Sequence, residues 1–141
     1  MKIVIETIPH EKQRYPTVGD WYFEPTYPAT NPEKGILLQP IETLHIRVSK
    51  LSDWRREALI AVHELVEVLL CKHEGITQES VDLFDNQFEA TRPEDNFDEP
   101  GDDPQAPYVK QHCTATGIER LLAAQLGVNW KEYEAELERL P

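Results

Sequence analysis

The amino-acid sequence predicts an α+β fold in which a small antiparallel sheet of three or four strands precedes about four helices. Two observations support this prediction. Residues 1–50 contain short β-branched and aromatic runs separated by prolines and glycines, whereas the spacing of apolar residues from 53 onward is helical. The length of 141 residues is that of a single domain, 1–141.

Four segments of the strand-rich part favour extended structure. Residues 2–8 (KIVIETI) are rich in β-branched residues, and residues 19–25 (GDWYFEP) contain three adjacent aromatic ones. After a long turn, residues 35–40 (GILLQP) are expected to form another short strand. In residues 43–49 (TLHIRVS), apolar and polar side chains alternate, which predicts a strand with one buried face. No helix intervenes to make a parallel crossover, so antiparallel pairing is expected.

The remainder of the chain predicts helices with recognisable ends. Ser52 or Asp53 can cap the first helix, which Gly75 ends, and Thr77 can cap the second, which ends before Pro93. The third and fourth helices carry apolar stripes on either side of a glycine. The four helices are expected at residues 53–75, 77–91, 109–127 and 130–140.

Residues 93–108 (PEDNFDEPGDDPQAPY) differ from the rest of the chain. Four prolines and many acidic residues exclude a regular element, so a long loop is expected. Its acidic residues are expected to be solvated; they could also bind a hard cation such as calcium, although their spacing does not match an EF-hand. The loop directly precedes the third helix, which suggests a flap near the mouth of a site.

Composition limits the partners of the protein. The net charge is −12, with 14 basic and 26 acidic residues, which argues against nucleic acid as a ligand. Two cysteines cannot form a disulfide framework, and no signal peptide or membrane-spanning run is evident. We expect a soluble protein of the cytoplasm without a membrane partner.

The first expected helix contains the segment ALIAVHELVEVLL (58–70), in which His63, Glu64 and Glu67 interrupt ten apolar residues. His63 and Glu67 are four residues apart and share a face, whereas Glu64 lies about 100° around the helix. A buried carboxylate is costly unless it is paired or bound to metal, so a divalent ion is favoured here. The side opposite the polar residues is expected to be core: Ala58, Ala61, Val62, Leu65 and Leu69.

A metal site needs a further ligand, which the third expected helix offers. His112 and Glu119 are seven residues apart and therefore lie on one face. If the two helices pack together, His112 completes a set with His63 and Glu67. Glu119 then serves as a fourth ligand or orients a histidine, whereas an exposed His112 at a helix start would bind nothing. The adjacent Cys113 is expected to be a buried structural thiol.

Residues 44–119 resemble a minimal zincin metallopeptidase, a family with the motif HExxH. The resemblance rests on the HExxE motif of His63, Glu64 and Glu67, with His112 and Glu119 following. It implies zinc at His63, Glu67 and His112, with Glu64 as the general base in hydrolysis of a peptide or small-molecule substrate. Glu67 stands where zincins have a second histidine.

A second resemblance is to the all-α nucleoside triphosphate pyrophosphohydrolases, which bind magnesium through ExxE and ExxD motifs. Glu64 and Glu67 form ExxE here, and Glu79 and Asp82 form ExxD. This alternative gives the histidines no role, and the strand-rich first third is foreign to that family.

The chain also resembles small uncharacterised proteins encoded in phage and prophage genomes. This resemblance leaves open a non-enzymatic function, in which the acidic surface binds a protein partner as an inhibitor does. His63, Glu64 and Glu67 would then form a buried polar network or a structural metal site.

Overall fold

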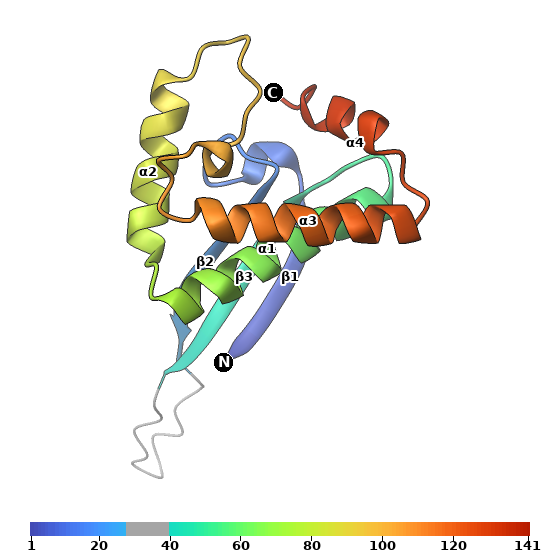
Figure 1. Ribbon diagram of the computed structural model, residues 1–141. Helices are drawn as coiled ribbons and strands as arrows, with labels where there is room; N and C mark the ends of the chain where they lie inside the picture. Colours follow the sequence, from blue (N-terminus) through green and yellow to red (C-terminus); the bar gives the residue numbers. More distant parts are fainter. Residues whose placement is uncertain (28–39) are drawn as a thin grey trace.

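The computed structural model describes residues 1–27 and 40–141, which form a three-stranded sheet and four α-helices (Figure 1). The α+β class is confirmed, and the strand expected at residues 35–40 lies, except for Pro40, outside the described residues. The strands are β1 (Lys2–Ile8), β2 (Gly19–Thr26) and β3 (Ile41–Ser49). The helices are α1 (Trp54–Glu74), α2 (Gln78–Thr91), α3 (Val109–Gln125) and α4 (Trp130–Leu137). Two short 3₁₀ turns, η1 (His10–Lys12) and η3 (Pro100–Asp102), lie in the connections.

The sheet is mixed, which corrects the predicted antiparallel pairing. Its order is β1-β3-β2, with β2 antiparallel and β1 parallel to the central β3. The prediction was wrong because β2 itself returns the chain along the length of the sheet and leaves β3 to run beside β1 in the same direction. A parallel pair therefore forms here without a crossover helix.

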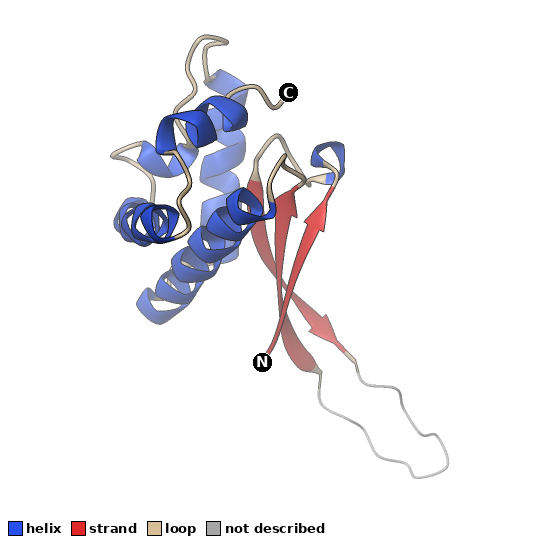
Figure 2. Cartoon of the chain, turned by 90° about the vertical axis from the view of Figure 1, so that its right-hand side faces the viewer, coloured by secondary structure: helices blue, strands red, loops and turns tan. Residues whose placement is uncertain are grey.

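The helices cover one face of the sheet, with α1 packed on the strands and α3 packed on α1 (Figures 1 and 2). The alternation predicted for β3 is confirmed, because Leu44, Ile46 and Val48 are buried in one cluster with Leu59 and Ile60 of α1. α1 is therefore the middle layer, between the sheet and α3.

This middle position corrects the predicted core face of α1. On the side expected to be core, Ala61 and Leu65 are partly buried against the core cluster, but none of the five residues is fully buried and Leu69 is 41% exposed. The buried face instead carries the polar residues, because α1 turns it toward both the sheet and α3. The buried residues of α1 are Glu57, Leu59, Ile60, His63, Glu67, Val68 and Cys71.

The helix ends follow the predicted capping residues. The Asp53 side chain accepts a hydrogen bond from the backbone N–H of Arg55 at 2.8 Å, and Gly75 ends α1 with a positive φ of 75°. Thr77 caps α2 and Asn129 caps α4 in the same way. None of the described helices is long and apolar enough to cross a membrane.

The acidic segment 93–108 contains the turn η3, which the prolines were expected to exclude. Pro100 at the start of η3 fits, since the first turn of a helix needs no N–H at that position. The turn contacts both α2 and the start of α3 (Figure 1). The segment therefore lies at the end of α3 that carries His112.

Candidate metal centre

Three side chains from α1 and α3 bring one potential ligand atom each to a common point. His63 Nε2 lies 3.4 Å from Glu67 Oε2 and 3.2 Å from His112 Nδ1. His112 Nδ1 lies 2.9 Å from Glu67 Oε2. Atoms that bind one tetrahedral zinc ion at about 2.0–2.1 Å are about 3.3 Å apart. The His63–Glu67–His112 group could therefore hold a metal ion.

The helix geometry explains how these side chains meet. His63 and Glu67 are one turn apart on the buried face of α1, and His112 lies in the first turn of α3. All three side chains are buried, each residue being 5% exposed. The predicted pairing of the two helices around these residues is confirmed.

Glu119 orients His63 and is not one of the converging ligand atoms. Its Oε2 lies 2.7 Å from His63 Nδ1, and its Oε1 accepts a hydrogen bond from the Tyr133 hydroxyl. In the tautomer that donates the Nδ1–H to Glu119, the neutral His63 ring presents an Nε2 lone pair to the centre. Of the two roles predicted for Glu119, the structure favours the orienting one.

The other two potential ligands also have supporting partners. Trp21 Nε1–H donates to Glu67 Oε1 at 3.0 Å, which leaves Oε2 free for the centre. His112 Nε2 faces Asp102 Oδ1 at 3.3 Å and Glu99 Oε2 at 3.4 Å. Partners of this kind are typical of metal ligands.

Sequence reasoning missed two of these partners. Trp21 and Tyr133 were assigned only to apolar runs, although a buried indole or phenol needs a hydrogen-bond acceptor and thereby signals a nearby carboxylate. The acidic loop supplies Glu99 and Asp102, for which the sequence predicts solvent or calcium as the partner rather than a histidine.

The electrostatics of the cluster favour a cation. Burial lowers the pKa of the His63 imidazole, but hydrogen bonds to Glu119 and Glu67 outweigh burial and raise it to about 11. Burial also lowers the pKa of His112, while Asp102 and Glu67 raise it to about 10. If both rings were protonated, two N–H groups would face each other across 3.2 Å. A shared divalent ion removes this conflict because it accepts all three lone pairs.

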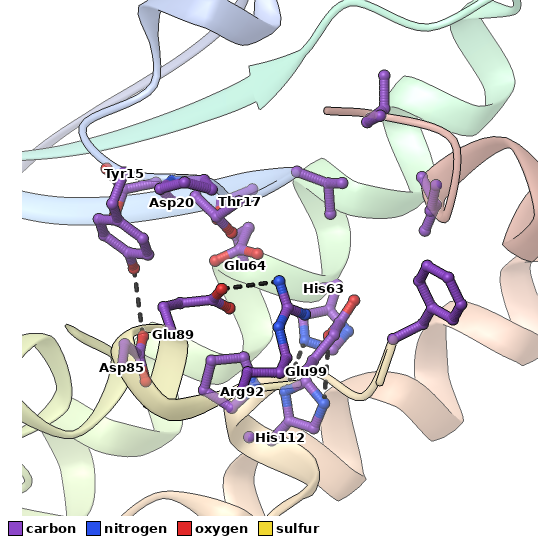
Figure 3. A pocket seen from close by; sticks show the side chains of 18 of the residues that line it. Tyr15, Thr17, Asp20, His63, Glu64, Asp85, Glu89, Arg92, Glu99 and His112 are labelled. Atoms are coloured by element: carbon purple, nitrogen blue, oxygen red, sulfur yellow. Dashed lines mark hydrogen bonds and ion pairs between the residues drawn. The ribbon is translucent and has the colours of Figure 1, made fainter. Parts of the chain in front are cut away.

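Glu64 lies beside the cluster in a cavity of about 440 Å³, which His63, Glu67 and His112 also line (Figure 3). Burial and the Glu67 carboxylate raise the pKa of Glu64 well above its usual range, although His63 lowers it. Gly19 makes room for this side chain, because a Cβ on Gly19 would lie 2.3 Å from Glu64 Oε1.

Polar and aromatic side chains other than Glu64 and the three potential ligands also line the cavity (Figure 3). Asp85 accepts hydrogen bonds from Tyr108 at 2.6 Å and from Tyr15 at 3.2 Å. Arg92 and Glu89, which also line the cavity, form an ion pair at 2.7 Å. The cavity therefore offers charged and hydroxyl groups, as well as apolar surface, next to the cluster.

The acidic segment closes over His112. Gly101 packs against the imidazole so closely that a Cβ there would lie 2.4 Å from His112 Cγ and Nδ1. With Glu99 lining the cavity, this contact is in line with the predicted flap position.

Two predicted features do not belong to the cluster. Asp82 pairs with Arg14 at 3.2 Å and Glu79 is exposed, so the ExxD motif does not join Glu64 and Glu67 in a metal-binding group within the described ranges. Cys113 is exposed rather than buried, because it lies on the side of α3 that faces away from α1.

Comparison with protein-family models, with curated proteins and with solved structures gave no match. The function is therefore inferred from the site alone.

Proposed function

We propose that the protein is a metal-dependent hydrolase in which Glu64 acts as the general base. The observation that carries this proposal is the convergence of His63 Nε2, Glu67 Oε2 and His112 Nδ1 within 2.9–3.4 Å of one another, next to the cavity that contains Glu64. Two imidazoles and one carboxylate suit zinc best among the common divalent ions.

The ion would supply Lewis acidity, lowering the pKa of a water molecule and polarising the bond to be broken. His63, Glu67 and His112 would hold the ion with three protein ligands, and the cavity that they line could admit a water molecule or a substrate as a further ligand. A structural zinc site has all four positions filled by protein, so three protein ligands beside a cavity favour catalysis.

Glu64 has the properties of a general base. Its side chain lines the cavity, and burial raises the pKa of its carboxyl group, which makes the carboxylate a stronger base. The substrates expected for this chemistry are peptides, amides or phosphate esters. A peptidase-like activity follows the zincin resemblance of the HExxE motif.

The test combines metal analysis with a hydrolysis assay of the full chain loaded with zinc. Chromogenic phosphodiester, anilide and peptide probes are compared for the wild type, Glu64→Gln and His63→Ala. We expect Glu64→Gln to retain stoichiometric metal and to lose about 100-fold or more in rate. His63→Ala should lose both metal and activity.

Glu74→Gln is the matched control, because it makes the same change at an exposed position of the same helix. It should leave rate and metal unchanged. Zinc-loaded protein without activity on any probe, or full activity in Glu64→Gln, would contradict the proposed hydrolase.

A further inference from the structure

β1 is an edge strand, and no strand of the described sheet pairs with its outer side. Ile3 and Ile5 are in register with Leu44 and Ile46, on the sheet face that packs against α1, yet they are 43% and 49% exposed. Figure 2 shows β1 at the front of the sheet with no helix in front of it. An uncovered apolar edge of this kind is a template for another strand.

The backbone of β1 presents its free hydrogen-bonding groups at Ile3 and Ile5. Ile8 accepts a hydrogen bond through its carbonyl oxygen from the N–H of Lys50 at 2.8 Å, so the polar backbone groups of Ile8 point toward β3. These groups alternate between the two edges of a strand. Those of Val4 and Glu6 therefore also point toward β3, and those of Ile3 and Ile5 point outward.

We propose that β1 pairs with β1 of a second copy of this chain, antiparallel and around a twofold axis at Val4. Three features of the segment KIVIE are self-complementary in this register. Lys2 lies opposite Glu6 of the partner subunit, and Ile3 lies opposite Ile5 of the partner subunit. The outward N–H and C=O groups of Ile3 form hydrogen bonds with those of Ile5 of the partner subunit, and the twofold axis repeats this pair on the other side of Val4.

The apolar and the charged side chains of β1 lie on opposite faces of the sheet. Ile3 and Ile5 extend the apolar layer beneath α1 across the dimer axis, and burial of their exposed surface favours association. Lys2 and Glu6 lie on the opposite face, where Glu6 also pairs with Arg47 at 3.2 Å. Opposite charges on directly facing residues stabilise a pair of antiparallel strands.

Self-complementarity is the argument for a second copy rather than a different protein. In an isologous antiparallel interface, the segment pairs with an identical segment that runs in the opposite direction. Residues 2–6 are complementary to themselves in this arrangement, in the charges of the facing side chains, in their shapes and in their backbone hydrogen bonds. The pairing would join two three-stranded sheets into one of six strands.

Sedimentation equilibrium of the full chain over a concentration series tests the proposal. We expect a reversible monomer–dimer equilibrium. Lys2→Glu and Glu6→Lys each place like charges opposite one another at both ends of the interface, and each should weaken the dimer about tenfold. An equimolar mixture of the two variants should form a heterodimer tighter than either homodimer, because every facing pair is again oppositely charged.

Lys12→Glu makes the same charge change outside the strand, at an exposed position of η1, and should leave the dimer unchanged. Circular dichroism and thermal unfolding of each variant exclude misfolding as the cause of a lost dimer. A monomer at every concentration would overturn the proposal and leave the edge to a foreign strand. A dimer whose dissociation constant is unchanged by both charge reversals would overturn the proposal as well, since the interface would then lie elsewhere.

Discussion

The Glu119 carboxylate holds the His63 imidazole in one orientation, with Oε2 2.7 Å from Nδ1. The Tyr133 hydroxyl of α4 donates to the other oxygen of the same carboxylate. Through these contacts α4, α3 and α1 together set the direction of the His63 Nε2 lone pair. The candidate centre is thus built from three helices, although its potential ligands come from two.

Glu119→Gln tests this supporting role. The variant keeps the size of the side chain but removes the charge that favours a proton on His63 Nδ1. We expect metal affinity to fall about 10- to 100-fold, measured by competition with a chromophoric chelator. Glu134→Gln, at an exposed position of α4, is the control. Equal affinities in the two variants would show that Glu119 does not support the centre.

Gly101→Ala should disturb His112 directly. The added Cβ would lie 2.4 Å from Cγ and Nδ1 of the imidazole, so either the ring or η3 must move. We expect metal affinity to fall at least about tenfold in the chelator assay.

Gly117→Ala is the matched control, because nothing lies within 4 Å of a Cβ at this position of α3. It should stabilise the helix by up to about 1 kcal/mol and leave metal binding intact. Unchanged metal affinity in both glycine variants would mean that the packing of η3 on His112 is unimportant.

Gly19→Ala should separate catalysis from metal binding. Its Cβ would lie 2.3 Å from Glu64 Oε1 and 2.7 Å from Ile60 Cγ2, so the Glu64 carboxylate must move while the three potential ligands stay in place. We expect metal content to stay stoichiometric and the rate of hydrolysis to fall about 100-fold, as for Glu64→Gln. The prediction fails if metal is lost together with activity, or if the rate is unaffected.

Asp85 should make the free energy of unfolding depend on pH. Burial raises its pKa from 3.8 to about 6, although hydrogen bonds from Tyr108 and Tyr15 lower it. The folded state therefore binds this proton more tightly than the unfolded state. The resulting stability is present below pH 3.8 and is lost as the pH rises through 6. The loss amounts to at most about 3 kcal/mol.

Asp85→Asn removes this titration. Its free energy of unfolding relative to the wild type should therefore increase between pH 4 and pH 7, as measured by urea unfolding across this interval. A difference that stays constant across the interval would show that Asp85 ionises in the folded protein as it does in the unfolded chain.

Local signals in the sequence predicted the helices and most of the centre. The capping residues Asp53 and Thr77 mark where α1 and α2 begin. The spacing of His63 and Glu67, and the spacing of His112 and Glu119, correctly placed each pair on one helix face. These features depend only on the spacing of residues within a few helical turns of each other, and this spacing can be read from the order of residues in the sequence.

The features that could not be predicted depend on long-range packing. α1 is apolar on nearly all sides, so its sequence does not show which side meets the sheet and which meets α3. Likewise Ile118 and Leu121 look like a core stripe, yet they are 40% and 66% exposed because α3 turns His112 and Glu119 inward. The parallel pairing of β1 with β3 depends on where β2 lies, which no local pattern determines.

The most direct test of the central claim is anomalous diffraction at the zinc edge from crystals grown with zinc. The proposed centre predicts one ion about 2.0–2.1 Å from His63 Nε2, Glu67 Oε2 and His112 Nδ1. It also predicts that the fourth ligand position opens to the cavity beside Glu64. Crystals with zinc in excess but no anomalous peak among these three atoms would contradict the claim and leave the cluster as a hydrogen-bonded network.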